Sequence, residues 1–189
     1  KIKFPIRKDL AAITYDIINS SKYHDVFVEG RPIRAVILQG FSESIIRHGG
    51  WRESHAGDSA YAHFGVLQTK LPAHALALQA AIEFRNFLNN LNQKYSLDVQ
   101  CGIGLHAAQN VLINVHSIAI QTNTEIVQQK SFDTTSADVD LVHRIESFVH
   151  RLPGTNIALS QRFVESLDFE ISDRVQLGSV HLKGQEHPT

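Results

Sequence analysis

The sequence predicts one α+β domain in which helices pack on a single β-sheet. Its 189 residues are enough for one domain, and 43% hydrophobic content with only 5 prolines is typical of a globular chain. Along the chain, short apolar runs that are typical of strands alternate with segments in which apolar residues recur every three or four positions, as in helices. The sequence shows no internal repeat or interdomain linker, so we expect residues 1–189 to form a single domain.

The first third of the chain predicts a strand, a helix and a hairpin. Residues 10–18 form an apolar run that ends at a polar cluster, as in a buried strand. Helical spacing starts at Pro32 and continues to two glycines at 49–50, which are a helix stop signal. Residues 51–56 and 59–66 predict two strands joined by a two-residue Gly-Asp turn.

The middle of the chain predicts a second helix and a further strand. Residues 74–91 carry a helical apolar stripe, and residues 97–106 alternate as a strand. We expect residues 110–120 to return antiparallel to that strand. The element order β-α-β-β-α-β fits a ferredoxin-like sheet layered with helices.

The last third predicts shorter elements. Residues 121–135 are polar and show no clear pattern, whereas Ser136 or Asp138 can cap a helix that runs to about His150. The remaining predictions are a strand over 156–160, a helix over 161–167 and a strand or hairpin over 175–183.

Composition excludes several classes of function. The chain has 18 basic and 19 acidic residues, so its formal net charge is −1. A protein that binds nucleic acid or a membrane surface mainly by charge carries a basic excess, so we expect neither partner. Cys101 is the one cysteine, which excludes an intrachain disulfide and favours a reducing, cytoplasmic location. No apolar run approaches the roughly 18 residues of a membrane span, and the absence of Met predicts an excerpt of a longer protein.

Two acidic residues stand where a sheet can bring them together. Asp16 lies inside the first apolar strand, where an unpaired carboxylate is costly to bury, and Asp58 lies at the hairpin turn. The first strand is expected to run beside this hairpin, so both carboxylates can meet at one edge. Mg²⁺ takes oxygen ligands, usually one or two carboxylates with substrate phosphates, and the backbone carbonyl of Ile17 offers another. The alternatives are a buried salt bridge for Asp16 and an ordinary turn residue at position 58.

Five sequence motifs occur in a characteristic order. They are Thr-Tyr-Asp-Ile-Ile-Asn-Ser-Ser at 14–21, a Gly-Gly…Gly-Asp…Phe-Gly hairpin at 48–65, Cys-Gly-Ile-Gly-Leu-His at 101–106, Val-Asp-Leu-Val-His-Arg-Ile-Glu at 139–146, and closing segments at 153–160 and 182–184. Together they resemble the catalytic domain of the class III nucleotidyl cyclases over about residues 10–184. The resemblance implies the same α+β fold, and an enzyme that forms a 3′,5′-cyclic nucleotide and pyrophosphate from a nucleoside triphosphate.

The resemblance also implies roles for individual residues. Asp16 and Asp58 would bind two Mg²⁺ or Mn²⁺ ions, one at the ribose 3′-hydroxyl and one at the triphosphate. Arg144 matches the arginine that stabilises charge on the transferring phosphate, and Lys183 matches a contact to the triphosphate. For Lys183 the alternative is an exposed lysine in a Lys-Gly turn. Members of this family act as head-to-tail dimers, so a homodimer is implied, with the aspartates of one subunit facing the arginine of the other.

Several positions depart from the family pattern. Asp140 replaces the Asn that orients the ribose; an ionised Asp offers no donor and repels the triphosphate unless it is protonated or paired with Arg144. Ser54 replaces the Lys or Glu that selects the base. Asp133 matches the second base position and resembles the adenylate type, which favours ATP over GTP. Ser136 replaces a glycine of the family.

Two other functions stay open at this point. The departures favour a cyclase-like domain that binds nucleotide or a partner without useful catalysis, whereas Asp16, Asp58 and Arg144 favour the enzyme. The third reading is a ferredoxin-like nucleic-acid-binding module, and the balanced charge speaks against it. The eleven histidines form no recognisable metal motif such as HExxH, so we expect structural or surface roles for them.

Overall fold

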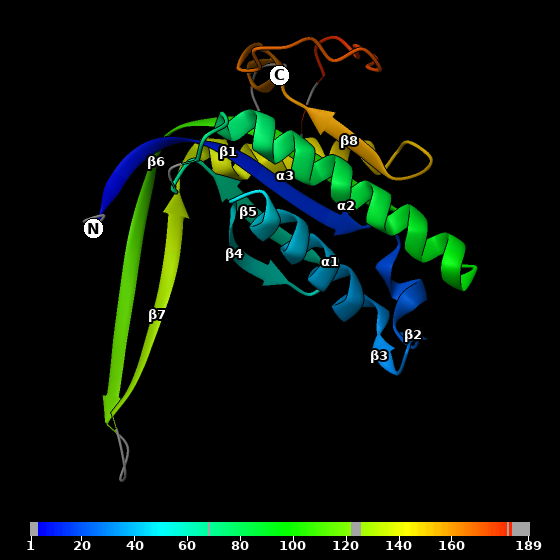
Figure 1. The fold of residues 1–189 in the computed structure, drawn as a ribbon, viewed down its shortest axis with the longest axis horizontal. Coiled ribbons are helices and arrows are strands. Elements are labelled where there is room, and N and C mark those ends of the chain that lie inside the picture. The colour runs from blue at the N-terminus through cyan, green and yellow to red at the C-terminus, as the bar shows by residue number, and fades with distance from the viewer. Residues whose placement is uncertain (1–3, 68, 122–125, 181, 183–189) are drawn as a thin grey trace.

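The computed structural model describes residues 4–67, 69–121, 126–180 and 182, which fold around a six-stranded sheet (Figure 1). The strand order is β4-β5-β1-β6-β7, and β8 pairs in parallel with β6. In chain order the elements are β1 (Ile6–Ile17), the 3₁₀ turn η1 (Ser20–Tyr23), β2 (Phe27–Val28), β3 (Arg31–Pro32), α1 (Ile33–Arg47), β4 (Trp51–Ala56), β5 (Ser59–Phe64), α2 (Ala73–Tyr95), β6 (Cys101–Gln121), β7 (Ile126–Thr135), α3 (Ala137–Val149), β8 (Asn156–Leu159) and α4 (Gln161–Glu165). The predicted α+β class is therefore confirmed.

Alternation along β1 assigns the two faces of the sheet to different helices. Tyr15 and its odd-numbered neighbours pack in the larger core with α1 and α2, which lie over the same face in Figure 1. Leu10 and Ala12 belong to a second core cluster that includes Val142 of α3. Because successive side chains of a strand point to opposite faces, Asp16 lies on the α3 face.

Three aromatic rings hold the carboxyl end of β1 from the side opposite α3. The ring centroid of Tyr15 lies 4.7 Å from that of Phe41 in α1 and 4.9 Å from that of Phe84 in α2. All three side chains are fully buried, and burial of one such ring contributes about 1.5–3 kcal/mol. The residue after Tyr15 is Asp16, so its backbone is fixed by packing on the opposite face.

Two glycines allow α3 to lie directly on β6. A β-carbon at Gly104 would come within 2.7 Å of the Val142 carbonyl oxygen and 2.8 Å of the Glu146 backbone nitrogen. A β-carbon at Gly102 would come within 2.7 Å of the ring of His150. These separations are well below van der Waals contact, so the Gly-Ile-Gly stretch is what permits the close approach of helix and strand.

The long strand β6 differs from the sequence prediction, because no turn separates residues 97–106 from residues 110–120. One strand runs from Cys101 to Gln121, and β1 pairs with it on both sides of Asn110. Asn110 has a φ of 51°, and its N–H donates to the Asp9 carboxylate at 2.8 Å. The register shift at this point is a β-bulge, which accommodates an extra residue without reversing the chain.

The far half of β6 pairs with β7 and forms a two-stranded arm that projects from the body in Figure 1. Its register runs from Leu112 opposite Thr135 to Gln121 opposite Ile126. The polar segment for which the sequence showed no pattern is therefore largely a strand. Its alternation is hidden because polar residues dominate it.

The remaining predictions have mixed outcomes. The hairpin and the helices expected from Pro32, over 74–91 and up to His150 are confirmed, and Ser136 caps α3 by accepting a hydrogen bond from Asp138 N at 3.0 Å. The strand or hairpin expected over 175–183 is wrong for its described part, since residues 175–180 form no strand. Val175 is 83% exposed and Leu177 is 52% exposed, so these apolar residues lack the buried face that a strand requires.

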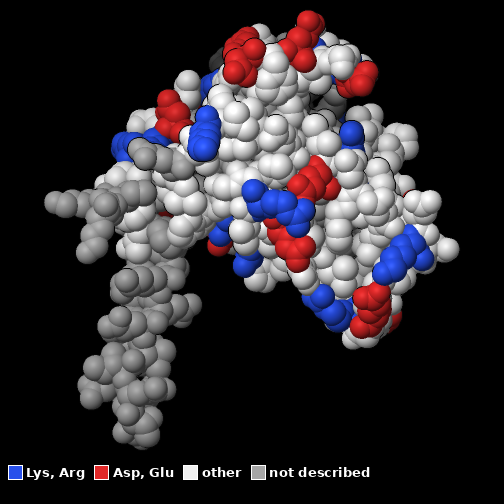
Figure 2. Space-filling model, in the orientation of Figure 1, with Lys and Arg blue, Asp and Glu red and all other residues white. Residues whose placement is uncertain are grey.

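Charge is dispersed over the described surface. Figure 2 shows basic and acidic side chains interspersed on the face in view, where no continuous basic patch is present among the described residues. This distribution agrees with the near-zero net charge. No helix in the described ranges is long and apolar enough to cross a membrane.

Candidate active site

The structure brings Asp16 and Asp58 to the same end of the sheet. Asp16 pairs with Ser59 of β5, and Asp58 directly precedes Ser59 in the turn after β4. Gly57 has a φ of 63°, which glycine adopts without strain and which a tight two-residue turn needs. Burial and the nearby charge of Asp58 raise the pKa of Asp16 above its ordinary value. Two carboxylates in mutual repulsion form an arrangement that a cation stabilises.

Ile17 follows Asp16 and ends β1. Its backbone N–H donates to the Asp16 carboxylate, which lowers the pKa of that group but does not offset burial and the charge of Asp58. The Ile17 side chain is buried in the larger core. Only main-chain groups of Ile17 are thus available to a ligand at Asp16.

Helix α3 adds a third carboxylate and an imidazole beside Asp16. Glu146 is 3% exposed, and its carboxylate contacts the imidazole of His150, which follows it by one helical turn. His150 Nε2 also lies 3.7 Å from Asp16 Oδ2. Burial, followed by the charges of Asp16 and Asp58, raises the pKa of Glu146 to about 8. We call Asp16, Asp58, Glu146 and His150 the Asp16 cluster.

The Asp16 cluster has the composition of a cation site. It contains three carboxyl groups and one imidazole within a partly buried environment. Glu146 Oε1 and His150 Nε2 are buried and contact each other, and neither has a further hydrogen-bond partner among the described residues. Ionised carboxylates are costly to bury side by side, and a bound cation offsets that cost. The residues therefore fit a divalent ion.

Asp140 and Arg144 share another face of α3 and are directed away from the Asp16 cluster. At 3.6 residues per turn, Arg144 lies about 200° around the helix from Glu146, whereas Asp140 lies only about 40° from Arg144. Asp140 is exposed and Arg144 is half-buried. One face of α3 thus contributes Glu146 to the Asp16 cluster, and another face carries Asp140 and Arg144.

Ser54 and Asp133 lie on the two strands that end the main strand order, and a partly buried glutamate joins those strands. Glu53 of β4 accepts hydrogen bonds from the backbone N–H and the hydroxyl of Thr134 in β7, both at 2.7 Å. His63 of β5 lies beside it, with Nδ1 3.2 Å from Glu53 Oε2. Although burial raises it, these contacts lower the pKa of Glu53 overall. Since Ser54 follows Glu53 and Asp133 precedes Thr134, the two candidate base-binding positions lie on adjacent backbone segments.

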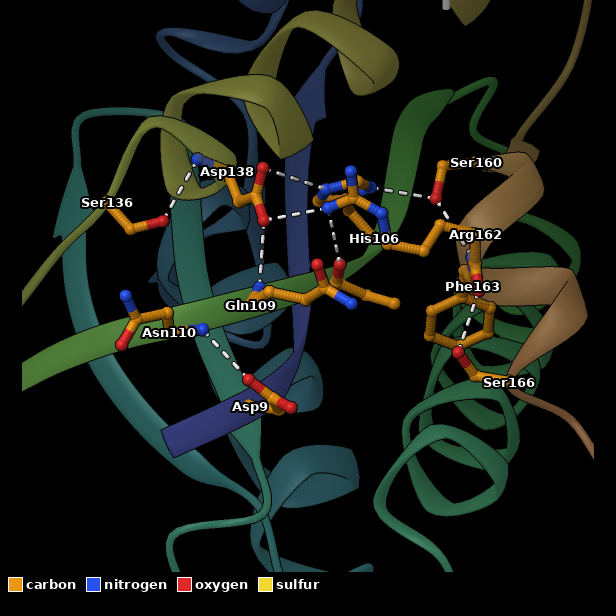
Figure 3. A network of polar contacts seen from close by, with 11 residues as sticks. Asp9, His106, Gln109, Asn110, Ser136, Asp138, Ser160, Arg162, Phe163 and Ser166 are labelled. Carbon is orange, nitrogen blue, oxygen red and sulfur yellow. Dashed lines mark hydrogen bonds and ion pairs between the residues drawn. The ribbon is translucent and has the colours of Figure 1, made fainter. Parts of the chain in front are cut away.

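A separate polar network holds the N-terminal end of α3 (Figure 3). Asp138 accepts hydrogen bonds from Arg162 of α4 and from the backbone N–H of Gln109, both at 2.8 Å. His106 of β6 lies between two groups: its Nε2 is 3.6 Å from Asp138 Oδ1 and its Nδ1 is 2.8 Å from Ser160 Oγ. The network ties α3 to β6 and α4, so it fixes the helix that carries Arg144.

Ser160, His106 and Asp138 follow one another in space as in a catalytic triad, but their role here is structural and they do not form a nucleophilic site. Ser160 is 6% exposed, and its hydroxyl caps α4 by accepting a hydrogen bond from Phe163 N at 3.1 Å. Burial lowers the pKa of His106, which keeps the imidazole neutral in the folded protein. A nucleophilic serine needs access to substrate, which this one lacks.

Sequence reasoning missed three residues of these sites and named one that cannot be placed. The spacing of Glu146 and His150, one helical turn apart, is a usable signal, but it matches no established zinc motif. Glu53 offered no local signal, because its partner Thr134 is 81 residues away. Lys183 lies outside the described residues.

Solved structures with a similar fold are catalytic domains of nucleotidyl cyclases. The guanylyl cyclase Cya2 matches with a TM-score of 0.71 and 21% identity, over 98% of this chain and 91% of that chain. The adenylyl cyclase CyaB from P. aeruginosa matches with a TM-score of 0.73 and 18% identity, over 98% and 93%. The guanylate cyclase domain of RhGC from Catenaria anguillulae, solved in complex with GTP, matches with a TM-score of 0.67 and 14% identity, over 95% and 92%.

No protein-family model matches the sequence, and no curated protein does. The structural likeness nevertheless extends over nearly the whole chain. The fold is therefore that of the class III adenylyl and guanylyl cyclase catalytic domains, in a chain of divergent sequence.

Proposed function

We propose that this domain is a nucleotidyl cyclase that converts a nucleoside triphosphate, ATP in preference to GTP, into a 3′,5′-cyclic nucleotide and pyrophosphate. The observation that carries the proposal is the juxtaposition of Asp16 and Asp58 at the end of β1. In this reaction the ribose 3′-oxygen bonds to the α-phosphorus and loses its proton. The bond from the α-phosphorus to the bridging oxygen breaks, and pyrophosphate leaves.

Asp16, Asp58 and the backbone carbonyl of Ile17 would hold two Mg²⁺ or Mn²⁺ ions. When bound, such ions lower the pKa of the 3′-hydroxyl and neutralise charge on the phosphates. Asp16 suits this role because burial and the charge of Asp58 disfavour its ionised form in the absence of a cation.

In this proposal a second copy of the chain completes the site. Arg144 and Asp140 project away from the Asp16 cluster of their own chain, so they would serve the cluster of a partner in a head-to-tail homodimer. A guanidinium stays protonated and matches phosphate oxygens, so Arg144 would stabilise charge on the transferring phosphate. One homodimer then contains two equivalent sites.

The nucleotide base would lie near Ser54 and Asp133. The contact between Glu53 and Thr134 supports this, because it holds the two neighbouring backbone segments together. A carboxylate at position 133 can accept a hydrogen bond from the amino group of adenine, which favours ATP. Lys183 is proposed to contact the triphosphate.

Asp140 favours a second candidate function, nucleotide binding or regulation with little or no turnover. The family pattern has an Asn donor at this position, whereas an ionised carboxylate repels the triphosphate. The alternative predicts nucleotide affinity without product.

The deciding experiment incubates the purified protein with each of the four nucleoside triphosphates and Mn²⁺ and identifies cyclic products by mass. We expect a cyclic product, with more from ATP than from GTP. Binding of nucleotide with no cyclic product from any of the four would establish the alternative. If the protein is active, Asp16→Ala and Arg144→Ala variants should each be inactive and should partly restore activity when mixed. Failure of the mixture would contradict a site shared between subunits.

A further inference from the structure

We propose that Asp16, Glu146 and His150 form a site for a divalent transition-metal ion with mixed oxygen and nitrogen ligands. The family resemblance assigns only Asp16, Asp58 and a backbone carbonyl to metal binding. The inference rests on the proposed function for the role of Asp16 and adds two side chains from α3 of the same chain. It therefore specifies the kind of ion that the domain takes.

The geometry of the three side chains suits a single ion. One oxygen from each carboxylate and one nitrogen of His150 all lie within 4.8 Å of one another. His150 Nε2 contacts Glu146 and lies 3.7 Å from Asp16 Oδ2. Two ligands of one ion, each at about 2.1 Å from it, are about 3–4 Å apart, so small side-chain adjustments are sufficient.

The backbone beneath the site leaves room for the ligands. Gly102 is the register partner of Asp16 on β6. A β-carbon at Gly102 would lie 2.7 Å from Cδ2 and 2.9 Å from Nε2 of His150 and would also contact Glu146. The absence of a side chain at this one position allows the α3 carboxylate and imidazole to reach Asp16.

The burial of Glu146 is the second, independent observation. Its side chain is 5% exposed, and Oε1 contacts His150 Nε2. Neither of these two buried atoms has a hydrogen-bond partner beyond that contact among the described residues. A buried carboxylate directed at an imidazole and a second carboxylate needs positive charge nearby. A divalent ion supplies that charge and takes both atoms as ligands in place of their direct contact.

The ligand types identify the class of ion. Mg²⁺ prefers oxygen ligands and retains water, whereas imidazole suits transition ions. A set of two carboxylates and one imidazole favours Mn²⁺, Co²⁺ or Zn²⁺ over Mg²⁺. The competing explanation is a buried Glu–His pair that only fastens α3 to β6.

The test measures metal binding to the protein without nucleotide, so its result is independent of turnover. Titration with Co²⁺, followed by absorption, and with Mn²⁺, followed by calorimetry, gives affinity and ligand character. We expect His150→Ala and Glu146→Gln each to weaken Co²⁺ and Mn²⁺ binding at least about tenfold and to affect Mg²⁺ less. The matched control is His143→Ala, which removes a histidine of the same helix outside the cluster and should leave binding unchanged.

Two results would overturn the proposal. One is unchanged Co²⁺ and Mn²⁺ affinity in folded His150→Ala protein, and the other is no specific binding to the wild-type chain. If a variant fails to fold, pulsed electron paramagnetic resonance of Mn²⁺ bound to the wild-type protein decides instead. An imidazole nitrogen coupling is expected, and its absence would favour the purely structural pair. A protein that binds Mn²⁺ through His150 but makes no cyclic product would leave this inference intact and remove the cyclase proposal.

Discussion

A histidine lies beside acidic groups at each end of helix α3, His106 of β6 at the N-terminal end and His150 at the C-terminal end, but the charge balance differs. At the N-terminal end, Asp138 is neutralised by Arg162 and receives a backbone hydrogen bond from Gln109. At the C-terminal end, Asp16, Glu146 and the imidazole of His150 lie together, and burial, together with the charge of Asp58, raises the pKa of both carboxyl groups. A buried ring nitrogen without a hydrogen bond occurs at both ends, in His106 and in His150, so the difference lies in the charges.

This difference separates a structural network from a candidate functional one. A charge-balanced network contributes stability and fixes geometry, since the Asp138 carboxylate is paired with Arg162 before any ligand binds. Carboxyl groups whose ionised forms are disfavoured by burial and by one another's charge gain more from a bound cation. The same helix thus carries an anchor at one end and a ligand site at the other.

The largest expected effect is at the C-terminal end. Asp16→Asn should lower cyclase activity about 100-fold or more, because a metal-binding carboxylate is lost from the reacting centre. The thermal midpoint of the metal-free protein should not fall, since the change relieves repulsion with Asp58. Parallel assays of cyclic product and thermal unfolding in EDTA test this. A marked drop in the thermal midpoint would show that Asp16 stabilises the fold and would contradict its role as a metal ligand.

An intermediate effect is expected at the N-terminal end. Asp138→Ala should lower the free energy of unfolding by about 2 kcal/mol, because Arg162 and the Gln109 N–H lose a charged acceptor. Activity per folded molecule should stay within a few-fold of wild type. Urea unfolding, with the exposed Asp168→Ala variant as the control, measures the change. A loss equal to that of the control would show that the network does not anchor the helix.

The smallest effect concerns the pH dependence of stability. Burial lowers the pKa of His106, so the unfolded chain binds more protons than the folded one as the pH falls below about 6.5. The contribution of His106 to stability should therefore decrease between pH 7 and pH 5, so the stability of wild type relative to His106→Gln should fall over that range. Urea unfolding at both pH values tests this. The exposed His24→Gln variant should follow the wild-type slope, and an equal slope in His106→Gln would contradict the assignment.

Local sequence signals were sufficient for most of the fold. The Gly-Asp turn at 57–58, the stop at Gly49-Gly50 and the cap at Ser136 each act within a few residues, so the sequence alone reveals them. Strand β6 was misread because a bulge and a turn have the same local polar signal around Asn110. Only pairing with the distant β1 distinguishes the two.

The candidate site was predictable to the extent that strand register determines it. Asp16 and Asp58 come together because the first strand pairs with the hairpin, which the element order already indicated. The approach of Glu146 and His150 depends on Gly102 and on how α3 crosses β6, which no short pattern encodes. The contact from Glu53 to Thr134 joins strands at the two ends of the main strand order and was invisible for the same reason.

The bulge at Asn110 also has a mechanical consequence. Eleven residues of β6 follow it, up to Gln121, and at about 3.3 Å per residue they span about 36 Å. A rotation of about 5° at the bulge would move the end of that strand by about 3 Å over this length. A small rotation at the bulge beside Asp9 is therefore amplified along the arm and displaces the far end of β6 by about the size of an atom.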